Sequence, residues 1–278
     1  MNLWYTEENN GNIRYGYKAK SVLFHEQSEF QSVDVIETEA FGKMMLIDSL
    51  VMITDVDEFV YHEMISHIPV CLHGKPKRVV VIGGGDGGTV RELLKYDCIE
   101  EIVLCEIDDV VIKAARQHFP EVSSGFDNPR VKINVGDGVA YMKNHQAGVL
   151  DLVIVDSTDP IGPGEGLFSK DFYRSVAKSL RPDGLMAAQS ESPWYDKGVL
   201  QRIKNNVSAG FSEVKNYMGA VPTYPRGFWS WTIAGNRKID PKEYDRKLFD
   251  SVKKDLQYLN DDMMTAVFAL PTFYRNKL

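Results

Sequence analysis

The chain has 278 residues, 44% of them hydrophobic and 26% charged, which is typical of a globular protein with a sizeable core and excludes a disordered one. Its net charge of -7 and its pI near 5.5 argue against a nucleic-acid-binding surface, which needs clustered Lys and Arg, but suit a cationic small molecule. No apolar stretch reaches the roughly 20 residues of a membrane span, and three cysteines without zinc spacing or a secretory signal predict a reduced, cytoplasmic protein with no metal site.

A small antiparallel β domain is expected over residues 1–56. Apolar and polar residues alternate over 30–37, 44–48 and 51–54, which is the period of a half-buried strand. From Asp57, the expected N-cap, the pattern becomes helical, and Pro69 is not expected to end this helix sharply. The helix opens the second predicted domain, residues 57–278.

Strands and helices then alternate. We expect strands at 78–82, 101–105, 131–135, 152–155 and 184–189, and helices at 88–96, 109–119, 139–145 and 170–180. A helix at 198–208, strands at 214–218 and 229–234, and terminal helices follow. Alternation of this kind predicts an α/β fold with a doubly wound, mostly parallel sheet and right-handed crossovers.

Two acids follow the apolar run 152–155, in the order Asp156-Ser157-Thr158-Asp159-Pro160. At the carboxyl end of a buried strand, where open α/β sheets bind ligands, a pair of anions indicates a cationic substrate. The same residues also fit a turn before Pro160 with Asp156 as its cap, so the pair alone does not decide between the two interpretations.

A glycine-rich loop follows the first predicted parallel strand. Gly83, Gly85 and Gly88 have the G-x-G-x-x-G spacing between a strand and a helix, and Glu106 ends the next strand. Glycines let the backbone approach a ligand closely, and an acid at this distance accepts hydrogen bonds from ribose hydroxyls. The loop predicts a nucleoside site; the alternative is a tight turn that binds nothing.

The glycine loop alone does not separate an NAD enzyme from an S-adenosylmethionine enzyme. Asp86 lies inside the loop, where it would repel a pyrophosphate but attract an amine or a sulfonium. Asp137 ends the third strand, suited to an adenine amino group. We therefore expect an adenosyl sulfonium ligand.

Taken together and in order, the glycine loop, Cys105-Glu106-Ile107-Asp108, Gly136-Asp137-Gly138 and residues 156–163 resemble the polyamine aminopropyltransferases, and most closely their spermidine synthase branch. Segments 61–64, 189–194 and 222–225 extend the resemblance from Trp4 to near the C-terminus. The chain departs from the family pattern at Arg226-Gly227, where the family usually has Ser-Gly, and this leaves the charge at the substrate mouth open.

The resemblance implies transfer of the aminopropyl group of decarboxylated S-adenosylmethionine to putrescine, giving spermidine and methylthioadenosine. The donor would be a co-substrate, with no tightly bound cofactor. The fold implied is a methyltransferase-like Rossmann domain with a small N-terminal β domain, and the assembly a homodimer or homotetramer.

Site residues follow from the same resemblance. Asp156 is similar to the general base, and Asp86 to the acid that holds the aminopropyl amine. Contacts to the nucleoside are implied for Gln31, Gly83, Gly85, Glu106, Ile107, Asp137, Gly138 and Pro163. The diamine site is implied to include Tyr61, His62, Asp86, Asp156, Ser157, Thr158, Asp159, Gln189 and Tyr224, with Trp4 either closing its far end or covering the N-terminal sheet.

Three other functions compete with this one. The acceptor could be cadaverine, a longer diamine or spermidine, or the protein could be a small-amine methyltransferase that uses S-adenosylmethionine. Asp86 argues against a methyltransferase, because it would repel the carboxylate of S-adenosylmethionine. A polyamine-binding protein without catalysis is disfavoured because the base, Asp156, is present.

Overall fold

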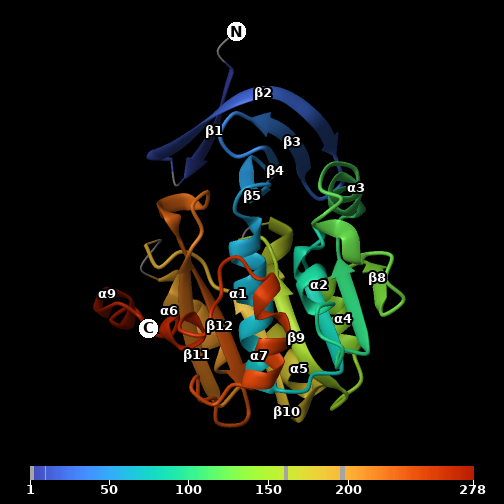
Figure 1. Cartoon of the computed structure of the whole chain (residues 1–278), viewed down its shortest axis with the longest axis vertical. Helices are drawn as coiled ribbons and strands as arrows, with labels where there is room; N and C mark the ends of the chain where they lie inside the picture. The colour runs from blue at the N-terminus through green and yellow to red at the C-terminus, as the bar shows by residue number, and fades with distance from the viewer. Residues whose placement is uncertain (1–2, 10, 160–161, 195–197) are drawn as a thin grey trace.

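Five antiparallel strands form the N-terminal sheet, and each pairs with the next along the chain (Figure 1). The computed structural model describes residues 3–9, 11–159, 162–194 and 198–278, and the side chain of Pro163 lies outside this description. The strands are β1 (Leu3–Asn9), β2 (Ile13–Gln27), β3 (Ser32–Thr38), β4 (Lys43–Ile47) and β5 (Leu50–Thr54). Asp48 and Ser49 alone separate β4 from β5, with φ of 47° and 67°, as a two-residue hairpin requires. The antiparallel N-terminal domain is confirmed.

Helix α1 (Glu58–His73) follows this sheet and continues through Pro69, as predicted. Asp57 is the N-cap residue, as predicted, but its side chain makes no capping hydrogen bond to the helix. Its buried carboxylate instead accepts hydrogen bonds from the Thr54 hydroxyl (2.6 Å) and from the backbone N–H (2.9 Å) and hydroxyl (2.7 Å) of Thr223. Asp57 thus ties the end of β5 to the loop after β11.

The second sheet has seven strands in the order β11-β12-β10-β9-β6-β7-β8. It runs parallel from β8 to β10, and β12 is antiparallel to both of its neighbours, so the mostly parallel sheet is confirmed. The bounds are β6 (Arg78–Gly83), β7 (Glu101–Glu106), β8 (Val131–Val135), β9 (Leu150–Asp156), β10 (Leu180–Gln189), β11 (Glu213–Ala220) and β12 (Phe228–Gly235). The strand order reverses between β6 and β9, which is where such sheets bind ligands.

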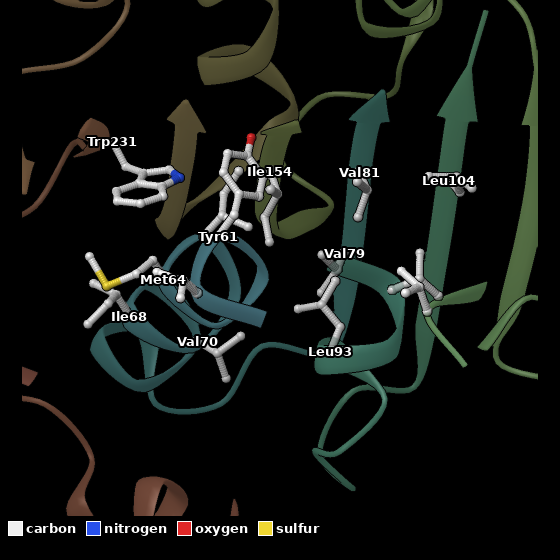
Figure 2. Packing of buried hydrophobic residues seen from close by; sticks show 14 of the residues in the cluster. Tyr61, Met64, Ile68, Val70, Val79, Val81, Leu93, Leu104, Ile154 and Trp231 are labelled. Atoms are coloured by element: carbon white, nitrogen blue, oxygen red, sulfur yellow. The ribbon is translucent and has the colours of Figure 1, made fainter. Parts of the chain in front are cut away.

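Helices cover both faces of this sheet, so its central strands are buried on both sides. On β6, Val79 and Val81 belong to one core, beneath α1, α2 and α3, whereas Val80 and Ile82 belong to the other, beneath α4, α5 and α6. Figure 2 shows the first core, where α1 packs against the sheet. The helices are α2 (Gly88–Leu93), α3 (Asp109–His118), α4 (Gly138–Asn144), α5 (Lys170–Ser179) and α6 (Val199–Val207).

The C-terminal segment packs back on the body through the helices α7 (Arg246–Val252), α8 (Met263–Ala266) and α9 (Thr272–Arg275). Buried Glu63 on α1 anchors it by accepting hydrogen bonds from the backbone N–H groups of Gln257 (2.7 Å), Tyr258 (3.0 Å) and Leu259 (2.8 Å). Among the described residues, no helix combines the length and the apolarity needed to cross a membrane.

Replacing Asp57 by Ala is expected to lower the free energy of unfolding by about 2 to 4 kcal/mol, because the buried hydrogen-bond donors of Thr54 and Thr223 lose their acceptor. Urea denaturation followed by circular dichroism measures this. Exposed Asp97 is the control, since Asp97→Ala should change stability by less than about 0.5 kcal/mol. Equal effects of the two substitutions would contradict the tying role of Asp57.

Candidate active site

A pocket of about 880 Å³, measured out to its mouth, opens at the carboxyl ends of β6, β7 and β9. The residues expected to contact the nucleoside gather in its wall: Gln31, Gly83, Gly85, Asp86, Glu106, Ile107, Asp137 and Gly138. Pro163 belongs to the 3-10 segment η2 (Gly162–Phe168), but its side chain, like all of Pro160 and Ile161, lies outside the described residues. We call this cavity the donor pocket.

At two positions of the loop other atoms lie so close to the backbone that only glycine fits. Gly83 has a φ of 78°, and a Cβ there would lie 2.2 Å from the backbone oxygen of Asp156. A Cβ on Gly88 would lie 2.2 Å from the imidazole of His62. The third glycine of the motif therefore makes room for a histidine ring, a role that the spacing alone did not indicate.

Glu106 ends β7 in the wall of the donor pocket and is held by the backbone. It accepts hydrogen bonds from the N–H groups of Gly85 (3.1 Å) and Asp108 (3.0 Å). Burial raises the pKa of Glu106 to about 7, against the lowering effect of these N–H groups. An acid so oriented is suited to accept hydrogen bonds from a vicinal diol.

The N-terminal sheet supplies part of the same wall. Met45 and Ile47 of β4 and Met52 and Ile53 of β5 line the donor pocket together with Gln31. The sequence analysis did not identify these four apolar residues as site residues. Their only signal was the period-2 pattern, which also describes ordinary core residues.

Asp156 is buried at the end of β9, and two hydroxyls hold its carboxylate. The Tyr61 hydroxyl donates to Oδ1 (2.7 Å), and the Thr89 hydroxyl donates to Oδ2 (2.6 Å). Burial and the neighbouring charge of Asp86 raise the pKa of Asp156, against the lowering effects of His62 and the two hydroxyls. Thr89, at the start of α2, was missed by the sequence analysis.

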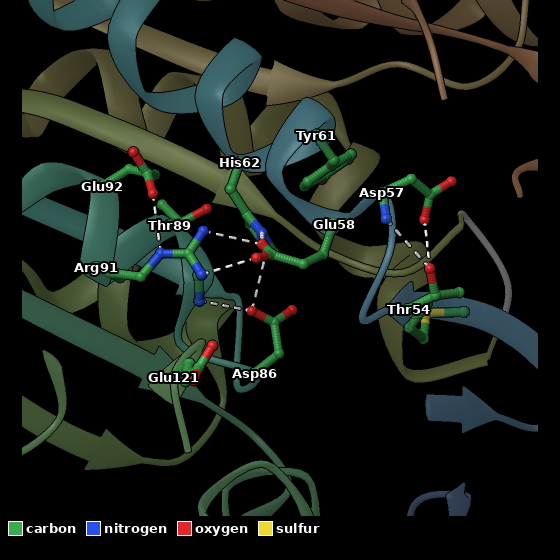
Figure 3. Close-up of polar contacts among 12 residues, drawn as sticks. Thr54, Asp57, Glu58, Tyr61, His62, Asp86, Thr89, Arg91, Glu92 and Glu121 are labelled. Atoms are coloured by element: carbon green, nitrogen blue, oxygen red, sulfur yellow. Dashed lines mark hydrogen bonds and ion pairs between the residues drawn. The ribbon is translucent and has the colours of Figure 1, made fainter. Parts of the chain in front are cut away.

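Asp86 lies in the donor pocket with His62 behind it (Figure 3). Its Oδ1 accepts a hydrogen bond from the Gly88 N–H (2.7 Å) and lies 3.1 Å from His62 Nε2. His62 is fully buried and is absent from the described lining of the donor pocket and of the neighbouring pocket around Asp159, so it reaches the donor pocket through Asp86. Burial disfavours the charged form of Asp86, but His62 and the Gly88 N–H lower its pKa below the ordinary value.

A second pocket, of about 410 Å³, adjoins the donor pocket, and we call it the acceptor pocket. The two share a wall made of Met52, Tyr61, Ser157, Thr158 and Tyr224. Asp159 and Gln189 line the acceptor pocket as well, together with Glu7 from β1, which the sequence analysis missed. The shared wall carries four of the nine residues predicted to bind the diamine, namely Tyr61, Ser157, Thr158 and Tyr224.

Three carboxyls gather around the acceptor pocket. The side chain of Asp159 is hydrogen-bonded to that of Glu191, which is buried and has a φ of 67°. Burial raises the pKa of Asp159, and burial together with Asp159 raises the pKa of Glu191 to about 9, so this pair holds a proton at neutral pH. Burial, with a contribution from Asp159, raises the pKa of Glu7 to about 7.

Two other expectations concerned aromatic and charged residues near the mouth. Trp4 is 57% exposed and is in the described lining of neither pocket. Its ring lies over Gly16 of β2, 3.5 Å from where a Cβ of that residue would be, so Trp4 covers the N-terminal sheet. Arg226, where the chain departs from the family pattern, has a φ of 67°, and its guanidinium donates to the backbone oxygen of Trp194. Its charge is therefore engaged with a loop carbonyl.

Two family models match the chain from residue 3 to residue 243, apart from residues 56 and 57. Residues 58–243 match the spermine/spermidine synthase domain, and residues 3–55 match the spermidine synthase tetramerisation domain. The polyamine aminopropyltransferase of Alkaliphilus metalliredigens is 42% identical over 280 residues, which cover 100% of this chain and 98% of that protein. The polyamine aminopropyltransferase of Caldicellulosiruptor saccharolyticus is 41% identical over 273 residues, which cover 98% of this chain and 97% of that protein.

Solved structures agree with these matches. The spermidine synthase from Thermotoga maritima superposes with a TM-score of 0.94 at 40% identity, over 99% of this chain and 94% of that one. A spermidine synthase in complex with the transition state analogue AdoDATO superposes with a TM-score of 0.95 at 40% identity, with the same coverage. The resemblance seen in the motifs is confirmed, and the chain belongs to the spermine/spermidine synthase family of aminopropyltransferase enzymes.

Proposed function

We propose that this protein transfers the aminopropyl group of decarboxylated S-adenosylmethionine to putrescine, giving spermidine and methylthioadenosine. The observation that carries the proposal is the pair of adjoining pockets with a common wall, beside which lies the buried carboxylate of Asp156. One pocket has the glycine loop and ribose-type acid of a nucleoside site, and the other is acidic, as a diamine requires.

In the proposal the donor is a co-substrate that occupies the donor pocket. Glu106 accepts from the ribose hydroxyls, while Asp137 and Gly138 face the adenine, flanked by Ile107. Asp86 holds the ammonium of the aminopropyl group by a charge-assisted hydrogen bond. In the proposal Gln31, Gly83 and Gly85 also contact the nucleoside, and so does Pro163 in the loop after β9.

The chemical difficulty lies with the attacking amine. The sulfur leaves as a neutral thioether and needs no acid, but an amine of pKa roughly 10.4 is neutral only about once in 2,500 molecules at pH 7, which costs about 4.6 kcal/mol. Asp156 takes this proton as general base. Its raised pKa favours proton acceptance, and the Tyr61 and Thr89 hydroxyls hold its two oxygens in one orientation.

The acceptor lies with its attacking nitrogen near Asp156 and its distal ammonium among the acids of the acceptor pocket. Ser157 and Thr158 line the passage, Gln189 donates to the Thr158 backbone oxygen (3.1 Å), and the distal ammonium meets Asp159. Tyr224 flanks the chain of methylenes; its hydroxyl donates to the Met52 backbone oxygen (2.8 Å), which leaves its lone pairs to accept from an amine. His62 acts through Asp86 in this arrangement.

We also propose that the protein is a cytoplasmic homodimer or homotetramer that assembles through its N-terminal sheet. That region matches the tetramerisation domain of the family. β1 is an edge strand, and Leu3, Trp4, Val22 and Leu23 expose apolar side chains on β1 and β2.

Asp156→Asn is expected to lower kcat by at least about 100-fold, because a positioned general base contributes about 10² to 10⁴. Chromatography of spermidine and methylthioadenosine formed from decarboxylated S-adenosylmethionine and putrescine measures it. An unchanged unfolding midpoint controls for folding. If the variant keeps more than about a tenth of the wild-type rate, Asp156 is not the base; if only cadaverine or spermidine is alkylated by the wild type, the acceptor assignment alone fails.

Asp86→Asn is expected to weaken binding of decarboxylated S-adenosylmethionine about 10- to 100-fold, because it loses a charge-assisted hydrogen bond. Binding of S-adenosylmethionine should tighten, since the carboxylate of its methionine moiety no longer meets an anion. Calorimetric titration of both ligands measures this. Unchanged affinity for S-adenosylmethionine would remove the argument against a methyltransferase, as would methylation of an amine by the wild type.

Putrescine binding at pH 7 is expected to release a proton from the Asp159–Glu191 pair. Burial and Asp159 raise the pKa of Glu191 to about 9 in the free site, so the pair holds one proton, and a bound ammonium favours its ionised form. Calorimetry in buffers of different ionisation enthalpy, with methylthioadenosine bound, counts the protons. The control is Glu191→Gln, which should release about one proton fewer than wild type; equal release by both would contradict the assignment.

A further inference from the structure

A row of four alternating charges runs from the surface of α2 to the donor pocket (Figure 3). The Arg91 guanidinium donates two hydrogen bonds to the Glu58 carboxylate (2.8 and 2.9 Å). Glu58 Oε2 lies 2.5 Å from His62 Nδ1, and His62 Nε2 lies 3.1 Å from Asp86 Oδ1. Of these four residues only Asp86 lines the donor pocket, whereas Arg91 and Glu58 line a separate pocket.

The ring of His62 is held in one place. Its side chain has no exposed surface, and the missing Cβ of Gly88 provides the space that the ring occupies. The Tyr61 ring packs against it edge to face, with centroids 5.5 Å apart and planes at 87°. This ring therefore has no room to turn away from the two carboxylates.

Both ring nitrogens of His62 face carboxylates, and an imidazole carries a proton on each nitrogen only as a cation. The contact of His62 Nδ1 with Glu58 is a short hydrogen bond. The contact of His62 Nε2 with Asp86 is an ion pair that does not have the geometry of a hydrogen bond. Burial disfavours the cation, but Asp86 and Glu58 outweigh it and raise the pKa of His62 to about 10. Against the opposing effect of burial, His62 and Arg91 lower the pKa of Glu58 to about 2.

A cation is needed here because two interacting carboxylates, Asp86 and Asp156, lie in the wall of the donor pocket. Burial disfavours the charged form of both, and the charge of Asp86 raises the pKa of Asp156 further. His62 is the charged group that lowers the pKa of both. Without His62 the pKa of both carboxyls would be higher, and protonation of Asp86 would remove the partner of a donor's ammonium, while protonation of Asp156 would remove the acceptor for an attacking amine's proton.

We propose that Glu58 and Arg91 are positioning residues: through His62 they keep Asp86 ionised, so that the donor pocket binds an amine-bearing nucleoside across the neutral pH range. The proposal rests on the proposed function only for the identity of that nucleoside. Other groups face this row from each side: Tyr61 from α1, Asp156 from β9, and Glu92 of α2, which accepts from Arg91 Nε (2.9 Å). In the described part of the chain, Tyr61 packs on the His62 ring and Glu92 contacts Arg91, but neither residue bridges His62 and Asp86.

Glu58→Gln tests the proposal, with Glu92→Gln as its matched control. Both carboxylates bind Arg91 and are largely buried, with 11% and 2% of their side chains exposed, but Glu92 contacts His67 (2.8 Å) and not His62. Removing Glu58 lowers the pKa of His62, and a neutral His62 lets the pKa of Asp86 rise. Glu58 also raises the pKa of Asp86 directly by repulsion, but the lowering effect of His62 on Asp86 is the larger of the two, so a net rise is expected. The acid limb of kcat/KM for the donor should then move to higher pH by about one unit, with activity regained above it.

Binding measurements separate this effect from a loss of structure. In Glu58→Gln at pH 7, the affinity for decarboxylated S-adenosylmethionine should fall about tenfold, whereas that for methylthioadenosine, which has no amine, should stay within about twofold of wild type. Glu92→Gln should leave both affinities and the pH profile unchanged. A parallel fall for both ligands, or equal shifts in the two variants, would overturn the proposal.

The charge of His62 is measured without any turnover by nitrogen-15 NMR of histidine-labelled protein, with His62→Gln to assign the signal among six histidines. In wild type both ring nitrogens should stay protonated to at least about pH 9, and in Glu58→Gln the ring should titrate at lower pH. Arg91→Lys, which keeps the charge but not the bidentate geometry, should lie in between. A neutral His62 at pH 7 in wild type would refute the positioning role even if the substrate assignment holds, and a cationic His62 in a protein that alkylates no diamine would refute the substrate assignment alone.

Discussion

Keeping two neighbouring carboxylates, Asp86 and Asp156, ionised in the wall of one pocket is the constraint on which the site depends. Charged groups avoid burial, and two like charges oppose each other further. The surrounding structure answers with the hydroxyls of Tyr61 and Thr89 on one acid, and with His62 and a backbone N–H on the other. Four elements, α1, the glycine loop, α2 and β9, must therefore meet at one point.

The glycine loop makes this meeting sterically feasible. At Gly83 the end of β6 lies so close to the backbone of Asp156 in β9 that a side chain would not fit. At Gly88 the His62 ring occupies the space that a Cβ would need. In many nucleotide-binding folds the loop glycines serve the ligand and the packing of the helix. Here the third glycine, Gly88, also makes room for the imidazole of His62, which forms an ion pair with Asp86 in the pocket wall.

The N-terminal sheet closes the site from above. It contributes apolar residues such as Met52 to both pockets, and Glu7 to the acceptor pocket. Asp57 bonds to Thr54 at the end of this sheet and to Thr223 near Tyr224, so the sheet and the Rossmann-like body are held together close to the site. Small displacements between these parts would therefore alter both pockets.

The sequence by itself determined the order of strands and helices, the antiparallel N-terminal sheet, the family, and the acids at the strand ends. Strands such as β6 and β9 are buried on both faces and read as unbroken apolar runs, and the glycine loop and Asp156–Asp159 lie directly at their ends, so local patterns were sufficient. Only the tertiary structure brought Glu7, Glu58, Thr89, Arg91 and Glu191 to the site. It also placed the His62 ring behind Asp86 and outside the described lining of both pockets. These residues lie on elements far apart in sequence, and their roles depend on which charges become neighbours after burial, a property that no local pattern of residues contains.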